Sequence, residues 1–120
     1  MEQRDVYESL LLELRRGTLV LSVLSQLKAP RYGYDLVQTL QEKGMPIDAS
    51  TLYPLLRRLE SQELLKSEWE TSAAKPRKYY VLTGFGQEVF TRLCESWNSL
   101  TESMNILMSE GDGEDDNKHK

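Results

Sequence analysis

The segment from residue 48 to residue 61 constrains the fold of this chain more than any other. Its apolar residues recur at the i, i+3, i+4 and i+7 positions of a helix: Leu52, Leu55, Leu56 and Leu59. Either Asp48 or Ser50 suits the N-cap of this helix. Pro54 favours Ser50, because a cap at Ser50 places the proline in or just beyond the first turn, where its missing N–H destabilises a helix least. The opposite side is polar and basic, and it comprises Ser50, Pro54, Arg57 and Ser61, flanked by Tyr53 and Arg58. The sequence therefore predicts a helix with one side in a core and a basic side exposed.

Two strand-like runs follow this helix. Leu65–Glu70 and Arg77–Leu82 alternate in the way that half-buried strands do, and the loop TSAAKP joins them. Lys75, Arg77 and Lys78 lie at or near the loop. The runs predict a two-stranded ribbon with a basic tip.

The residues before the basic helix predict two further helices. The apolar spacing between residues 6 and 27 predicts one helix, whose wide apolar stripe is buried on more than one side. Within it, Gly17 marks a bend, a cap or a close helix contact. Pro30 ends this pattern, and a second helix is expected over Gly33–Lys43, with Gly44 at its C-terminal cap.

A long last helix, capped by Thr83, is predicted to run to about Ser109. Its apolar residues form a heptad seam: Phe90, Leu93, Trp97, Leu100, Met104 and Leu107. Such a seam must pack against its own domain or against a second subunit. We expect residues 1–82 to form the main domain, residues 83–109 to be a dimerisation helix of the same compact unit, and residues 110–120 to be a disordered acidic tail.

The order of these elements is that of a winged helix-turn-helix, a mostly α fold with a two-stranded β wing. A helix fits the major groove of DNA, where arginine grips guanine with two hydrogen bonds, and cations at the wing tip suit phosphates or a minor groove. Arg57 and Arg58 also have a simpler interpretation, as a solvated helix face paired with Glu60 or Glu63. Periodicity alone favours that interpretation, and the second basic cluster on the wing opposes it.

The charge balance bears on the choice of partner. Of the net charge of −4, −3 lies in the last eleven residues, which hold five acidic residues and two lysines, so residues 1–109 carry −1. Because exposed charges are screened over about 8 to 10 Å, the charge of the docking face matters more than the total. The acidity is compatible with a basic DNA-reading surface, and it also supports a rival, a winged-helix protein-interaction module without DNA binding.

The residue types present disfavour an enzyme, a metal site and a membrane protein. His119 is the only histidine and Cys94 the only cysteine, so neither a His-based triad nor a metal cage is expected. No apolar run approaches the roughly 20 residues of a membrane span, and residues 1–10 lack the apolar core of a signal peptide. We therefore expect a cytoplasmic protein without cofactor or metal.

Two stretches resemble the signature of the PadR family of bacterial regulators, TLYPLLRRLESQELLKSEW (Thr51–Trp69) and KPRKYYVLTGFGQ (Lys75–Gln87). YGYDL (Tyr32–Leu36) is similar to the family's second-helix entry, and CESW (Cys94–Trp97) to the last helix of its short members. The resemblance covers roughly residues 10–108. The wing loop lacks the glycines common in the family, so the depth to which the wing inserts does not carry over.

The resemblance implies a homodimer that binds a pseudo-palindromic DNA operator, usually as a repressor; an activator is an alternative that the sequence does not distinguish. The last helix and part of the first would exchange packing between subunits. The positions carried over to the major groove are Ser50, Thr51, Tyr53, Pro54 and Arg57, with Arg58 beside them. The wing positions Lys75, Arg77 and Lys78 would approach the DNA backbone or the minor groove.

Trp97 has two interpretations. Some short members of the family bind flat aromatic or cationic drugs in a pore at the dimer interface, stacked on a tryptophan of the last helix. Trp97 matches that position, so the resemblance implies a small aromatic or cationic effector. Its place in the apolar seam supports simple packing in a core, which we favour.

Overall fold

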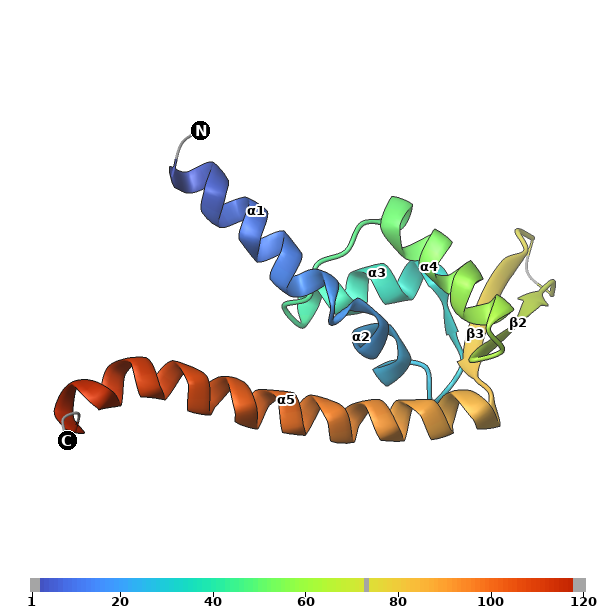
Figure 1. Ribbon diagram of the computed structural model, residues 1–120. Coiled ribbons are helices and arrows are strands. Elements are labelled where there is room, and N and C mark those ends of the chain that lie inside the picture. The colour runs from blue at the N-terminus through green and yellow to red at the C-terminus, as the bar shows by residue number, and fades with distance from the viewer. Residues whose placement is uncertain (1–2, 73, 118–120) are drawn as a thin grey trace. The chain divides into compact units, whose positions relative to one another are not determined.

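The computed structural model describes residues 3–72 and 74–117, with side chains as far as residue 110. Its elements are α1 (Gln3–Arg16), α2 (Leu19–Ser25), β1 (Arg31–Tyr32), α3 (Gly33–Glu42), α4 (Ala49–Ser61), β2 (Leu65–Glu70), β3 (Arg77–Leu82) and α5 (Gly84–Asn117) (Figure 1). The chain forms two compact units, residues 1–90 and 91–120, so only the first turns of α5 belong with the preceding elements. The sequence predicts a single unit. Within the described part of the chain, no helix has both the length and the apolar character needed to cross a membrane.

The sheet has three antiparallel strands in the order β1-β3-β2, one more than the sequence predicts. Between β1 and β3, Arg31 lies opposite Tyr80 and Tyr32 lies opposite Tyr79. Between β2 and β3, the pairs run from Leu65 opposite Leu82 to Glu70 opposite Arg77. The bounds of β2 and β3 agree with the two predicted runs. A strand as short as β1 gives no alternating pattern, so its pairing with β3 alone reveals it.

The hydrophobic core of the first unit lies between α2, α3, α4 and the sheet. α3 contacts α2, α4, β1 and β3, and α4 also contacts β2. The largest fully buried side chains are Val23, Leu24, Leu27, Leu36, Leu52, Leu56, Leu59 and Leu65. Each buried leucine contributes roughly 1.5 to 3 kcal/mol relative to an exposed one. This burial orients α4, whose opposite side is consequently left to solvent.

The first predicted helix is two helices separated at Gly17 and Thr18. The Thr18 hydroxyl donates to the Arg15 carbonyl at 2.7 Å, which draws the side chain back onto the end of α1. A Cβ added to Gly17 would meet nothing within 4 Å, so Gly17 does not mark a close helix contact. Its position between the end of α1 and the start of α2 supports the predicted bend. No residue of α1 is buried. The prediction that this stripe is buried on more than one side is therefore wrong for α1 in the single chain.

Asp48, and not Ser50, caps α4. An Asp48 carboxylate oxygen accepts from the Thr51 amide at 3.0 Å and from the Ser50 hydroxyl at 2.8 Å. The Ser50 bond and then the Thr51 bonds hold the pKa of Asp48 below its ordinary value. Pro54 consequently lies inside the helix rather than in its first turn. The predicted cap of α3 is confirmed, because Gly44 has a φ of +86° and the next amide donates to the Leu40 carbonyl at 2.8 Å.

The start of α5 is fixed to the base of the β2–β3 ribbon. The Thr83 hydroxyl accepts from the Gly86 amide at 2.9 Å, as its predicted role as N-cap requires, and donates to the Glu63 carbonyl at 2.6 Å. A Cβ on Gly86 would collide with the Leu64 carbonyl oxygen. The helix continues to Asn117, past its predicted end at about Ser109 and through much of the segment expected to be disordered. The last part of that segment, residues 118–120, lies outside the described residues.

Candidate nucleic-acid interface

The polar side of α4 is exposed, as the leucine stripe requires. The predicted residues on this side that are exposed are Ser50, Thr51, Pro54, Arg57 and Arg58. Among the residues that the structure describes, no ion pair joins Arg57 or Arg58 to Glu60 or Glu63. The guanidinium groups are thus not neutralised by the acidic neighbours that the simpler interpretation invoked.

Tyr53, also predicted to read DNA, is half-buried against the start of α3. A Cβ added to Gly33 would lie 2.6 Å from Cε1 of the Tyr53 ring, so only glycine leaves room for the ring in this position. Tyr53 therefore contributes to the packing of α4 on α3 as well as to the exposed side.

The wing carries Lys75 and Arg77 in exposed positions. The Arg77 guanidinium lies 4.1 Å from the centroid of the Tyr32 ring. That ring meets Tyr79 edge-on at 6.2 Å, and the Tyr79 hydroxyl donates to Glu68 at 2.9 Å. The bond to Glu68 raises the pKa of Tyr79. Arg77 is therefore held on an aromatic surface with its charge open to solvent.

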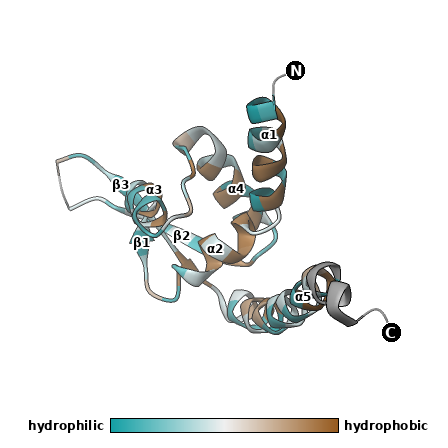
Figure 2. Cartoon of the chain, turned by 90° about the vertical axis from the view of Figure 1, so that its left-hand side faces the viewer, coloured by the Kyte–Doolittle hydropathy of each residue, from teal (hydrophilic) through white to brown (hydrophobic). Residues whose placement is uncertain are grey.

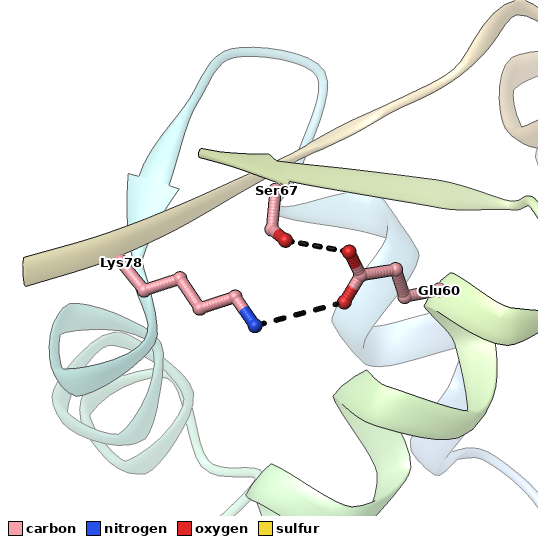
Figure 3. A network of polar contacts seen from close by, with 3 residues as sticks. All are labelled: Glu60, Ser67 and Lys78. Carbon is pink, nitrogen blue, oxygen red and sulfur yellow. Dashed lines mark hydrogen bonds and ion pairs between the residues drawn. The ribbon is translucent and has the colours of Figure 1, made fainter. Parts of the chain in front are cut away.

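Lys78 is placed differently from the other two wing cations. Its ammonium lies 3.9 Å from Glu60 Oε1 on α4, and Glu60 Oε2 accepts from the Ser67 hydroxyl at 2.6 Å (Figure 3). The same ammonium lies 5.6 Å from the centroid of Tyr80 and 5.9 Å from that of Trp69. Lys78 thus faces α4 from the wing.

A groove of about 410 Å³ lies between α3, α4 and the wing, which we call the wing groove. It is lined by Tyr32, Gly33, Tyr34, Tyr53, Arg57, Trp69, Pro76, Arg77, Lys78 and Tyr80. Three of these described residues are cationic and none is acidic, although the chain as a whole carries a charge of −4. Burial raises the pKa of Tyr80 at the floor, which remains neutral. The surface fits a polyanion whose sugar faces can contact aromatic rings.

Sequence reasoning missed the aromatic part of this groove. Tyr34 is 71% exposed and Trp69 is 61% exposed, and both line it. Tyr34 lies next to Gly33 in the YGYDL stretch, but nothing in that stretch shows that it faces α4. The alternation of β2 places Trp69 on the same face as the apolar Leu65, and this pattern does not indicate that its ring is exposed.

The predicted interface residues on α5 fall into two groups. Phe90 is buried in the first unit, with the Lys28 ammonium 5.3 Å from its ring centroid. Leu93 is half-buried. The exposed members of the seam are Trp97 (45% exposed), Leu100, Met104 and Leu107, and Ile106 and Met108 on the same helix are exposed as well.

α1 also carries an exposed apolar series. Its exposed members are Val6, Tyr7, Leu10, Leu12 and Leu14, and Figure 2 shows apolar residues recurring along this helix with polar residues between them. A monomeric soluble protein rarely leaves so much apolar surface uncovered.

Comparison with known proteins agrees with this geometry. Residues 20–92 match the model of the transcriptional regulator PadR-like family. The chain is 52% identical to a PadR family transcriptional regulator from Eggerthella lenta DSM 2243, with a TM-score of 0.83 over 88% of this chain and 94% of that chain. It is 38% identical to a PadR-like transcription factor from Bacteroides fragilis, with a TM-score of 0.68 over 82% of this chain and 98% of that chain. A PadR family transcription regulator from Clostridium difficile R20291 is 29% identical, with a TM-score of 0.70 over 76% and 98%. Comparison with curated proteins gives no match.

Proposed function

The chain belongs to the PadR-like family of transcriptional regulators, and we propose that it is a cytoplasmic, homodimeric repressor that binds a pseudo-palindromic DNA operator. In this proposal, α4 enters the major groove, where the exposed Arg57 grips a guanine. The wing approaches the backbone through Lys75 and Arg77, with Lys78 at its base.

The observation that carries the proposal is the wing groove. Its lining has no acidic residue in a chain that is acidic overall, and two of its three cations, Arg57 and Arg77, have no described ion pair. The groove joins the exposed side of α4 to the wing. This concentration of positive charge on one face is what a phosphate backbone requires, because the field of distant acidic residues is screened.

The homodimer is supported by the exposed apolar residues of α1 and α5. Both helices leave large apolar side chains uncovered in the single chain, and a second copy would bury the same residues on both subunits. An operator with two half-sites about one helical turn apart would then match the two-fold symmetry of the dimer.

A small aromatic or cationic effector is the further part of the proposal. Trp97 is 45% exposed on α5, so its ring has a free face in the single chain. A ligand that stacks on this ring and prefers a dimer with mis-spaced recognition helices would lower operator affinity by shifting the population of dimers.

The proposal is tested by anisotropy titrations of the upstream DNA of its own gene and of a scrambled duplex, repeated over a salt series. Arg57→Ala should weaken operator binding by about 1 to 3 kcal/mol and leave binding to the scrambled duplex much less affected. Lys66→Ala is the matched control, because it removes one exposed cation of β2 that does not line the wing groove. Failure of the parent protein to bind any duplex at low salt would support the protein-interaction alternative instead.

A further inference from the structure

Glu60 lies on α4 but contacts the wing. Its carboxylate accepts a hydrogen bond from Ser67 of β2 at 2.6 Å and lies 3.9 Å from the ammonium of Lys78 on β3 (Figure 3). One side chain of the recognition helix is therefore joined to both strands of the wing. Two contacts from two strands fix the direction of the wing more closely than either contact would alone.

Lys78 is enclosed by groups that attract its charge. The carboxylate of Glu60 lies on one side, and the rings of Tyr80 and Trp69 lie within 6 Å, where an aromatic face attracts a cation. The side chains of Lys78 and Glu60 are only 32% and 34% exposed, so solvent screens this pair less than a fully exposed one. Lys75 and Arg77 of the wing are exposed, and no described carboxylate pairs with them.

We propose that Glu60 is a positioning residue that holds Lys78 against the recognition helix and withholds its charge from DNA phosphates. This inference rests on the proposed function. A lysine that neutralises a phosphate releases a condensed counterion and steepens the salt dependence of binding, whereas a lysine already paired inside the protein releases none. The number of phosphates that the wing neutralises is thus set by a carboxylate that does not touch DNA.

Glu60→Gln is the informative variant, because glutamine keeps an acceptor for Ser67 and removes the charge that holds Lys78. The plot of log affinity against log salt should become steeper by about 0.9, the value for one more phosphate contact. The ratio of the affinity of Glu60→Gln to that of the parent protein should therefore be about 3.5-fold higher at 50 mM salt than at 200 mM salt. The increase should be the same for the operator and for the scrambled duplex.

Glu68→Gln is the matched control. It removes the same charge from the neighbouring residue of Ser67, on the opposite face of β2, where the carboxylate binds Tyr79 and not Lys78. Its salt slope should equal that of the parent. Lys78→Ala alone should also leave the slope unchanged, and in the Glu60→Gln background it should remove the added slope.

The outcomes separate this inference from the proposed function. Equal slopes for Glu60→Gln and Glu68→Gln, or a slope flattened by about 0.9 in Lys78→Ala alone, would show that Lys78 already neutralises a phosphate and would overturn the inference while DNA binding stands. A parent protein that binds no duplex would refute both. Thermal melts establish whether the variants fold. If Glu60→Gln does not fold, the salt slope of Lys78→Ala in the parent background tests the inference.

Discussion

Gly86 and Gly84 lie two residues apart in the first turn of α5, yet alanine should have opposite effects at the two positions. A Cβ on Gly86 would collide with the Leu64 carbonyl oxygen, whereas a Cβ on Gly84 would meet nothing within 4 Å. Helix propensity alone favours alanine at both positions by up to about 1 kcal/mol. The close approach of α5 to the base of the wing should reverse that preference at Gly86 only.

The magnitude follows from what the Leu64 carbonyl already binds. It accepts from the Thr83 amide at 3.1 Å and from the Thr83 hydroxyl at 3.3 Å. Moving the carbonyl away from a new methyl group weakens both bonds, each worth about 0.5 to 1.5 kcal/mol, and overpacking adds about 1 to 3 kcal/mol. After the gain in helix propensity is subtracted, Gly86→Ala should lower the free energy of unfolding by about 1 to 5 kcal/mol.

Urea unfolding followed by circular dichroism measures this difference. All variants are compared at one protein concentration, because association of subunits adds to apparent stability. Gly84→Ala should unfold at the same or a slightly higher urea concentration than the parent, with an unchanged slope. Equal midpoints for the two variants would refute the close contact between Gly86 and Leu64.

Two further predictions concern the cap of α4 and the ring on α5. Because bonds from Ser50 and then Thr51 lower the pKa of Asp48 from its ordinary 3.8, the stabilisation by this cap is present above that value and is lost as the pH falls through the folded-state pKa. Asparagine cannot be protonated in this range, so the stability of Asp48→Asn should fall less than that of the parent as the pH is lowered through the pKa of Asp48, as measured by thermal melts. The same loss of stability in both proteins would contradict the role of Asp48 as a charged cap. If Trp97 stacks the proposed effector, Trp97→Ala should abolish fluorescence quenching by a flat aromatic cation and leave the dimer intact by light scattering. Loss of the dimer would favour Trp97 as packing.

The parts of the fold that were predictable are those in which burial imposes a period on the sequence. Leu52, Leu56 and Leu59 are buried along α4 as their spacing indicates, and β2 and β3 have the predicted bounds. α1 shows the limit of this reasoning. Its apolar stripe is that of a buried helix, but no residue of α1 is buried in the single chain. The spacing of apolar residues indicates that a helix face is buried, but it does not identify the molecule that covers the face.

The candidate site was less predictable, because its contacts join elements distant in sequence. Spacing along α4 suggested that Glu60 pairs with an arginine of its own helix, whereas Lys78 from β3 occupies that carboxylate. The exposed rings of the wing groove were missed for the same reason. Trp69 lies on the same face of β2 as the buried Leu65, yet it is 61% exposed.

The strand order has a consequence for association in the cell. β3 is paired on both sides, so β2 presents the longer outer edge of the sheet. An open edge is a template on which another chain can add a strand, and natural proteins guard such edges with charged residues. Lys66, Glu68 and Glu70 place charges of both signs along β2. They discourage growth of the sheet into fibres through this edge.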